Sequence, residues 1–250
     1  MAGHSKWKNI RDRKGAQDAK KGKVFSRVLK EITVAVKTGG GPDPETNPRL
    51  RAALLNARSM NMPKDIIERA IKRASGEECA NLLEVTFEGY GPGGVAIFIE
   101  CTTDNNTRTV GNLRSYFGKH GGSLGKDGCL QFVFDRKAVF TLPVAAIDED
   151  DFTLQMIDAS ADDVEFDREN DTITVTSAVE NFGKVQRKFE ELKLETTESS
   201  LQRIPNDFKQ LDAETFQSVM KLIEKIEDDD DVQKVYHNIE YSDELAKALE

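Results

Sequence analysis

Apolar residues in the first third of the chain recur with the spacing of amphipathic helices. Positions i, i+3, i+4 and i+7 are apolar from Phe25 to Val36, and this pattern predicts a helix that ends at the Gly39–Pro42 run. Asn47 followed by Pro48 is typical of a helix N-cap, so a second helix is expected through about Met60. A third should follow Met62-Pro63 and end near Gly76.

The pattern changes to short β-rich runs after residue 80. Residues 82–88 and 94–101 predict two strands around a glycine loop, and Asp104-Asn105 predicts the start of a helix that ends near His120. The run from Cys129 to Phe134 is expected to be a strand. The loop contains a G-x-G-x-x-G string at 89–94, but a strand and not a helix follows it. A tight strand connection is therefore favoured over a dinucleotide site.

Residues 137–204 give the order β-α-β-β-α-β, which is that of a ferredoxin-like module. A helix over 213–227 and a strand over 232–240 would then complete the earlier β-β-α-β piece. We therefore predict an α+β fold of three domains. They are a basic all-α bundle over 1–76 and two ferredoxin-like α+β domains, one inserted in the other. The outer domain is discontinuous, over 77–134 plus 206–250, and the inserted domain covers 135–205.

The charge of the chain is divided sharply. Residues 1–75 hold 18 Lys and Arg against 7 Asp and Glu, whereas residues 76–250 hold 17 against 37. A basic segment on an acidic body points to a polyanion partner, nucleic acid above all, although a basic face that only solvates one domain is the simpler alternative. Trp7 is expected either to stack on an unpaired base or to dock the segment on its own domain. The predicted nucleic-acid-binding residues are Lys6, Trp7, Lys8, Arg11, Arg13, Lys14, Lys20, Lys21, Lys23, Arg27, Arg49, Arg51, Arg69, Lys72 and Arg73.

The cysteines and the acidic runs argue against disulfide, zinc and calcium sites. Cys79, Cys101 and Cys129 are widely spaced, which favours a reducing compartment and argues against a disulfide framework or a zinc site. We expect no cofactor, no metal, no catalytic residues and no membrane span, and we expect a cytoplasmic protein. The acidic runs at 148–151 and 228–231 lack the spacing of a calcium loop, so solvated charge at a helix end is the favoured interpretation.

Several strings resemble those of one family, the YebC/PmpR family. They include Met1-Ala-Gly-His-Ser-Lys-Trp, the Asn61-Met-Pro-Lys-Asp string, Phe87-Glu-Gly-Tyr-Gly-Pro-Gly-Gly, Thr103-Asp-Asn-Asn-Thr-Arg-Thr and His120-Gly-Gly-Ser-Leu. The resemblance implies an all-helical first domain and two α+β domains. It also implies the function of its members, which are described as bacterial DNA-binding transcriptional regulators and as a mitochondrial translational activator of cytochrome oxidase.

The predicted function is therefore a non-enzymatic nucleic-acid-binding regulator of gene expression, by resemblance a DNA-binding transcriptional regulator. The alternative is a translation factor associated with ribosomal or messenger RNA or with the ribosome. The absence of a heptad seam or a recognisable helix-turn-helix motif favours RNA slightly. An enzyme with its site in the 89–104 region is the third hypothesis, and converging titratable groups with shifted pKa values would support it. The oligomeric state stays open, with a monomer favoured.

Overall fold

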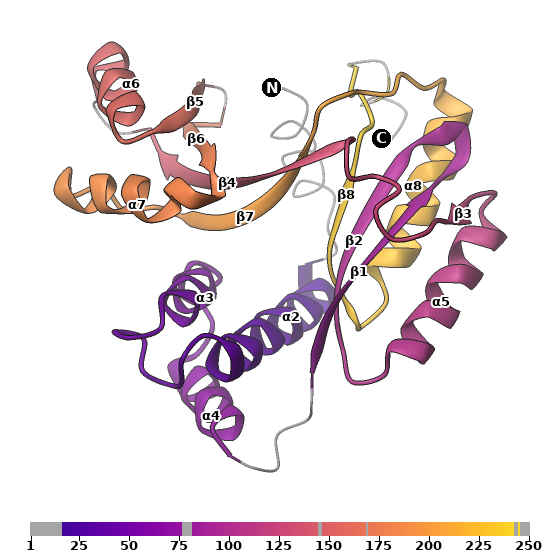
Figure 1. Cartoon of the computed structure of the whole chain (residues 1–250), viewed down its shortest axis with the longest axis horizontal. Coiled ribbons are helices and arrows are strands. Elements are labelled where there is room, and N and C mark those ends of the chain that lie inside the picture. The colour runs from indigo at the N-terminus through magenta and orange to yellow at the C-terminus, as the bar shows by residue number, and fades with distance from the viewer. Residues whose placement is uncertain (1–16, 77–81, 145–146, 169, 243–244, 246–250) are drawn as a thin grey trace. The chain divides into compact units, whose positions relative to one another are not determined.

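The computed structural model describes residues 17–76, 82–144, 147–168, 170–242 and 245 (Figure 1). The chain divides into two compact units. The first takes residues 1–30, 78–135 and 204–250, and the second takes residues 31–77 and 136–203. Each unit holds one four-stranded sheet, and the fold is α+β, as predicted. The division into three domains stays a prediction.

The N-terminal segment folds into three helices, of which the second and third begin and end close to the predicted residues, whereas the first begins at Gln17, eight residues before the predicted pattern at Phe25. Its helices are α2 (Gln17–Thr38), α3 (Pro48–Ser59) and α4 (Lys64–Ala74). The side chain of Asn47 caps α3 by accepting a hydrogen bond from the Leu50 amide at 2.9 Å. The capping prediction is therefore confirmed. The apolar stripes are buried, including Ile32 on α2, Ala53 on α3 and Ile67 on α4.

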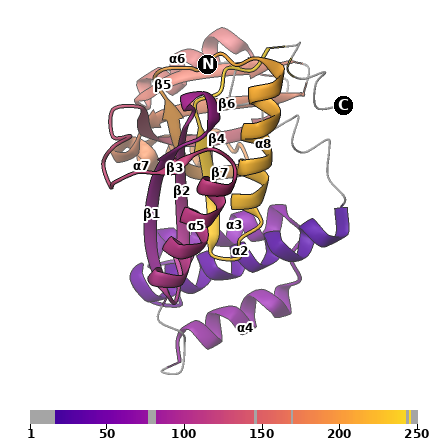
Figure 2. The ribbon, with the colours of Figure 1, turned by 90° about the vertical axis from the view of Figure 1, so that its right-hand side faces the viewer.

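The first unit is built on a sheet with strand order β3-β1-β2-β8. Its strands are β1 (Leu83–Tyr90), β2 (Ala96–Thr103), β3 (Ser123–Leu124) and β8 (Val232–His237). β2 is central and pairs antiparallel with β1 and with β8. The helices α5 (Asn106–Lys119) and α8 (Ala213–Glu227) cover one face of this sheet, as Figure 2 shows. Their buried side chains, among them Phe117 and Phe216, pack with Ile97 and Ile99 of β2.

The second unit holds the ferredoxin-like module. Its elements, in chain order, are β4 (Phe134–Pro143), α6 (Glu149–Asp158), β5 (Ala161–Asp167), β6 (Thr172–Ala178), the 3-10 turn η2 (Val179–Asn181), α7 (Phe182–Glu191) and β7 (Glu198–Pro205). The sheet order is β5-β6-β4-β7, which places the first and third strands of the module in the centre, as a β-α-β-β-α-β chain requires. Phe140 of β4 packs against Phe189 of α7 at 5.4 Å between ring centroids.

For two loops of the first unit, one prediction is confirmed and the other is wrong. The glycine loop is a tight strand connection, as predicted. It holds the 3-10 turn η1 (Pro92–Gly94), and Gly93 and Gly94 both adopt positive φ. The strand expected from Cys129 to Phe134 is wrong, because residues 127–133 form turns and β4 begins only at Phe134. The buried carboxylate of Glu88 accepts hydrogen bonds from the amides of Gly128 and Leu130, which holds this segment out of a sheet.

Candidate nucleic-acid interface

Eight of the predicted nucleic-acid-binding residues have no described side chain. Lys6, Trp7, Lys8, Arg11, Arg13 and Lys14 lie outside the described residues, and Lys20 and Lys21 belong to α2 with their side chains outside that description. Their role stays a prediction from sequence. The other seven, Lys23, Arg27, Arg49, Arg51, Arg69, Lys72 and Arg73, fall into two groups with different surroundings.

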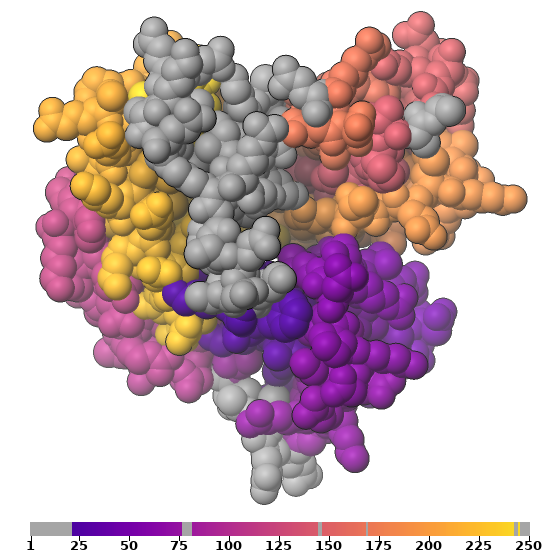
Figure 3. Space-filling model, turned by 180° about the vertical axis from the view of Figure 1, so that it is seen from behind, coloured from indigo at the N-terminus to yellow at the C-terminus, as the bar shows by residue number. Residues whose placement is uncertain are grey.

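The first group lies on α3 and α4, whose surface is the purple region of Figure 3. Arg49 and Arg51 of α3 are held by neighbouring residues. Arg49 donates to the Thr38 hydroxyl at 3.0 Å, and Arg51 donates to the carbonyls of Pro44 and Glu45. The acceptors of these three hydrogen bonds are neutral oxygen atoms.

The cations of α4 differ in their partners. Arg69 pairs with Asp65 one turn earlier at 2.7 Å, so its charge is partly neutralised on its own helix. Lys72 and Arg73, in the last turn of α4, are exposed and have no carboxylate partner in the part of the chain that the structure describes. They lie off the side of α4 on which Ile67 and Ala74 are buried. These two residues are therefore exposed predicted contacts whose charge no described carboxylate neutralises.

The second group, Lys23 and Arg27 of α2, contacts acidic residues that follow α8. Lys23 Nζ lies 2.6 Å from Asp228 Oδ1, and Arg27 donates to the carbonyl of Glu227. Lys30, which was not among the predicted contacts, continues this side of α2. Its ammonium group donates to the carbonyls of Thr102 and Asp230.

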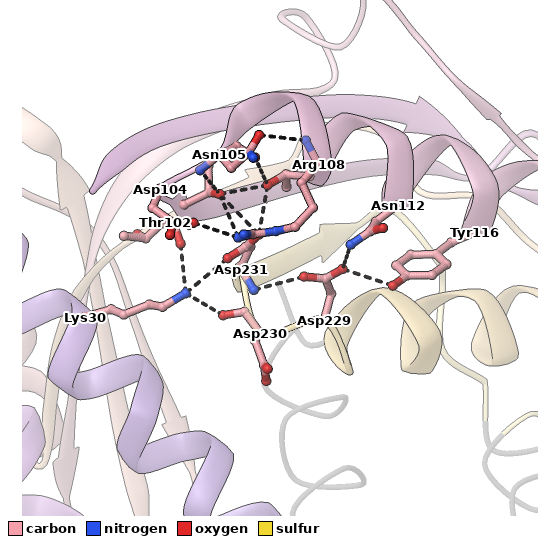
Figure 4. Close-up of polar contacts among 12 residues, drawn as sticks. Lys30, Thr102, Asp104, Asn105, Arg108, Asn112, Tyr116, Asp229, Asp230 and Asp231 are labelled. Carbon is pink, nitrogen blue, oxygen red and sulfur yellow. Dashed lines mark hydrogen bonds and ion pairs between the residues drawn. The ribbon is translucent and has the colours of Figure 1, made fainter. Parts of the chain in front are cut away.

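Asp231 lies at the centre of a polar network next to these cations (Figure 4). The residue is only 5% exposed. Its Oδ2 accepts from Arg108 at 2.7 Å and from the hydroxyl of Thr109 at 2.9 Å, and its Oδ1 lies 3.3 Å from Lys30 Nζ. Burial alone would raise the pKa of Asp231, but the hydrogen bonds from Arg108 and Thr109 and the charge of Lys30 lower it below its usual range.

The string Thr103-Asp-Asn-Asn-Thr-Arg-Thr supplies most of this network. Asn105 caps α5 by accepting from the Arg108 amide at 3.0 Å, which confirms the predicted helix start. The cap places Arg108 and Thr109 in the first turn of α5, beside the Thr103 hydroxyl, which donates to Asp231 at 3.2 Å. Residues of this string therefore donate the hydrogen bonds that stabilise the buried carboxylate of Asp231.

Asp229 is held in the same region by α5. Its Oδ2 accepts from Asn112 and from the hydroxyl of Tyr116, both at 3.0 Å. Burial and the hydrogen bond to Asp229 raise the pKa of Tyr116 to about 12. The acidic run at 228–231 was predicted to be solvated, and for Asp231 this is wrong. Asp229 is half-buried, and only Asp228 and Asp230 are exposed.

Two titratable groups in this region have pKa values that are shifted away from neutrality. Burial and neighbouring carboxylates raise the pKa of the Cys101 thiol to about 12, and the pKa of Asp231 is lowered. Catalytic groups need pKa values near the working pH, and these shifts lead away from neutrality. Among the described residues, no group of three or more His, Cys, Asp or Glu is placed to hold a metal ion. None of the described helices combines the length and the apolar character needed to cross a bilayer.

Comparisons with known proteins cover nearly the whole chain. Residues 5–77 match the model of the TACO1/YebC protein N-terminal domain, and residues 82–239 match that of the TACO1/YebC second and third domain. A crystal structure of a conserved hypothetical protein from Aquifex aeolicus superposes with a TM-score of 0.80 at 39% sequence identity, over 90% of this chain and 93% of that one.

Curated relatives share this length. One from Amoebophilus asiaticus is 52% identical over 96% of this chain and 98% of its own, and one from Magnetococcus marinus is 46% identical over 100% and 99%. A third, from a Geobacillus species, is 47% identical over 97% and 98%. All three carry the name probable transcriptional regulatory protein. With both family models and full-length relatives matched, this chain belongs to the TACO1/YebC family.

Proposed function

We propose that this protein is a non-enzymatic regulator of gene expression that binds nucleic acid through its basic N-terminal helical segment. The observation that carries the proposal is the separation of buried apolar and exposed basic residues on α4, where Lys72 and Arg73 are exposed without carboxylate partners in the described structure. Such cations suit the phosphate backbone, which provides most of the affinity of nucleic-acid-binding proteins. The printed names of the relatives support transcription as the regulated process and duplex DNA as the first partner to test.

The connection between α3 and α4 also supports duplex DNA. Only residues 60–63 separate the two helices, and Asn61 in this turn has a φ of 55°. Two helices joined by a turn of three or four residues are the basic element of a helix-turn-helix motif. Sequence analysis did not single out this turn, because it carries Asn61 at the left-handed position where a glycine is the usual signal.

A second candidate, an RNA-associated translation factor, is favoured by the distribution of charge along α4. In helix-turn-helix proteins the N-terminal residues of the second helix contact base edges. The N-terminal half of α4 exposes the carboxylates of Asp65 and Glu68, whereas Lys72 and Arg73 lie in its last turn. This helix therefore suits backbone contacts better than base reading, and RNA is often recognised through its shape and backbone.

Charge reversal on α4 tests the proposal. The double variant K72E/R73E should bind a 20-bp duplex and a 20-nucleotide RNA at least about tenfold more weakly at 100 mM salt, with a salt slope reduced by about 2. The matched control is K184E/R187E on α7, which makes the same charge change on another exposed helix. Fluorescence anisotropy measures both. Equal effects of the two variants would contradict a site on α4.

Crosslinking in cells followed by sequencing of the attached DNA and RNA then separates the two candidates. Discrete DNA peaks that disappear in the K72E/R73E variant would identify a transcriptional regulator. Enrichment of ribosomal or messenger RNA, lost in the same variant, would identify a translation factor. If the K72E/R73E variant keeps both the DNA signal and the RNA signal, both candidates are overturned.

A further inference from the structure

Cations occupy successive turns on one side of α2. Lys23, Arg27 and Lys30 stand at positions i, i+4 and i+7, which places them on one face of a helix. Each of them contacts the segment Glu227–Asp231, which joins the end of α8 to β8. A face that sequence alone assigns to nucleic acid is thus occupied by another part of the chain.

The end of α8 is suited to receive cations. The last carbonyl groups of a helix have no partner within it, and the helix dipole adds partial negative charge there. Arg27 donates to the carbonyl of Glu227 at 2.5 Å, and Lys23 Nζ donates to the carbonyl of Asp228 at 3.3 Å. The carboxylate of Asp228 adds a full negative charge, and its pKa is lowered chiefly by the hydrogen bond from Lys23. Lys23 and Arg27 therefore cap the C-terminus of α8.

The contacts differ in how easily a solute can replace them. The Lys30 side chain is 24% exposed, and its ammonium group is surrounded by the carbonyls of Thr102 and Asp230 and the carboxylate of Asp231. The pair formed by Lys23 and Asp228 is 44% and 61% exposed. Exposed ion pairs contribute little to stability and are screened by salt. The contact of Lys23 is therefore the replaceable one, and that of Lys30 is structural.

Lys23 can be reached from solvent, since its side chain is 44% exposed. The small polar depression beside it, lined by Lys23, Ser26, Arg27, Asp229 and Asp230, has room for little more than a water molecule, so a phosphate would meet Lys23 at the surface. A phosphate and the Asp228 carboxylate offer the same kind of charge-assisted hydrogen bond to Lys23.

We propose that the segment Glu227–Asp231 is an intramolecular competitor of nucleic acid, in which Asp228 holds Lys23 until a phosphate replaces its oxygen atoms. Arg27 and Lys30 keep their contacts while Lys23 exchanges partners. This inference rests on the proposed function, since it concerns a cation that would add to those of α4 in nucleic-acid binding. It predicts that the chain binds nucleic acid more weakly than it would if Asp228 did not hold Lys23.

Neutralising Asp228 tests the competition. The variant D228N should bind a 20-bp duplex or a 20-nucleotide RNA about two- to fivefold more tightly at 50 mM salt, the range that an exposed ion pair allows. Its salt slope should be steeper by about 0.9, the value for one added phosphate contact on duplex DNA. The matched control is D207N, which changes an exposed aspartate of the same unit and the net charge by the same amount. This control should bind as the unmodified chain does.

A second substitution shows whether Lys23 is the cation released. K23Q alone should change the affinity by less than about twofold, because Asp228 already occupies Lys23. In K23Q/D228N the gain of D228N should disappear. A gain that persists in this double variant, or that D207N matches, would overturn the proposal.

The same titrations separate this inference from the proposed function. If the unmodified chain binds, K72E/R73E weakens binding and D228N changes nothing, the competitor is overturned and the function stands. If none of the variants binds either probe, the proposed function fails and the competitor fails with it. If only D228N binds a probe, the result supports the proposed function and the competitor.

Discussion

Asp231 is the residue on which the polar network of the first unit depends. Its carboxylate is buried and accepts from two threonine hydroxyls and from Arg108, with Lys30 beside it. A carboxylate taken out of water needs such partners, because each missing hydrogen bond to a buried charged group costs free energy of folding. The network therefore joins the start of α5, the start of β8 and one turn of α2.

The variant D231N should lower the free energy of unfolding by about 2 kcal/mol at pH 7, since it removes the charge that these hydrogen bonds serve. The lowered pKa of Asp231 fixes the sign of the pH dependence. A carboxylate with a lowered pKa stabilises the fold above its unfolded value, about 3.9, and loses that contribution as the pH falls through the folded value. Urea unfolding at pH 7 and pH 3 should therefore show a smaller difference between the two chains at pH 3.

The neighbouring Asp230 provides the control for this prediction. Its side chain is exposed, and it contacts Lys30 through its backbone carbonyl, which D230N leaves intact. D230N should change the stability by less than about 0.5 kcal/mol at either pH. Similar losses in D230N and D231N would show that net charge, and not the network, determines stability here.

For single residues, the sequence shows the charge of a side chain but not its burial or its partners. The acidic run at 228–231 was visible, but nothing in it separates buried Asp231 from exposed Asp228. The difference is set by partners far away in the chain, Lys30 and the 103–109 string. Lys23 and Arg27 raise the same problem, since their basic character was evident and their acidic partner was not. Such contacts are a property of the tertiary fold.

Among the elements, α3 depends on an unusual N-cap. Asn47 is fully buried, and its side-chain amide donates to the carbonyls of Ala35 and Gly41 while its oxygen caps α3 at Leu50. One side chain thus satisfies the end of α2, a loop and the start of α3. The space around it is tight, because a Cβ on Gly39 would lie 2.4 Å from the Asn47 oxygen.

The variant N47A should lower the free energy of unfolding by about 2 kcal/mol, since it removes the cap of α3 and the donor to the Gly41 carbonyl, whereas the Ala35 carbonyl keeps the Gly39 amide. N47D keeps the oxygen acceptor but places a buried carboxylate oxygen against the carbonyls of Ala35 and Gly41, so at pH 7 its loss should equal or exceed that of N47A. The comparison variant is D212A, which removes the exposed cap of α8 and should cost about 1 kcal/mol. Chemical denaturation measures all three, and equal losses for N47A and D212A would contradict the role of the amide.

Elements with strong local signals were predicted well. The limits of α8 agree with the predicted 213–227, because a capping aspartate and a long apolar stripe mark it. The failure at Cys129–Phe134 has a tertiary cause, since Leu130 is buried in turns that Glu88 holds, while Phe132 in the same run is 84% exposed. The strand β3 was not predicted, because two residues carry too little pattern.

For the whole molecule, the division of charge is the dominant electrostatic feature. The basic segment should bind nucleic acid with a salt slope near −5 for duplex DNA, if about six phosphates are neutralised. Deleting residues 1–16 removes five Lys and Arg and one Asp, and it should flatten this slope. Titration at several salt concentrations measures the slope of both chains. An affinity that does not depend on salt would contradict the electrostatic account.

The order of elements also predicted the ferredoxin-like module and its strand order, since β-α-β-β-α-β chains close in few ways. The candidate interface was predicted less completely. Hydrophobic periodicity identifies which face of a helix is buried, and it therefore placed the cations of α4 outside. It does not reveal which exposed cations meet acidic residues of the same chain.

The chain enters and leaves the second sheet at neighbouring points, and this affects where insertions and deletions are tolerated. The amide of Asn206 donates to the carbonyl of Val133 at 2.8 Å, so the chain leaves the first unit and returns to it at neighbouring points. A segment with adjacent ends adds little closure entropy to its host, whatever its length. Residues 136–203 should therefore tolerate insertions and deletions in their loops while the register of the first sheet stays fixed.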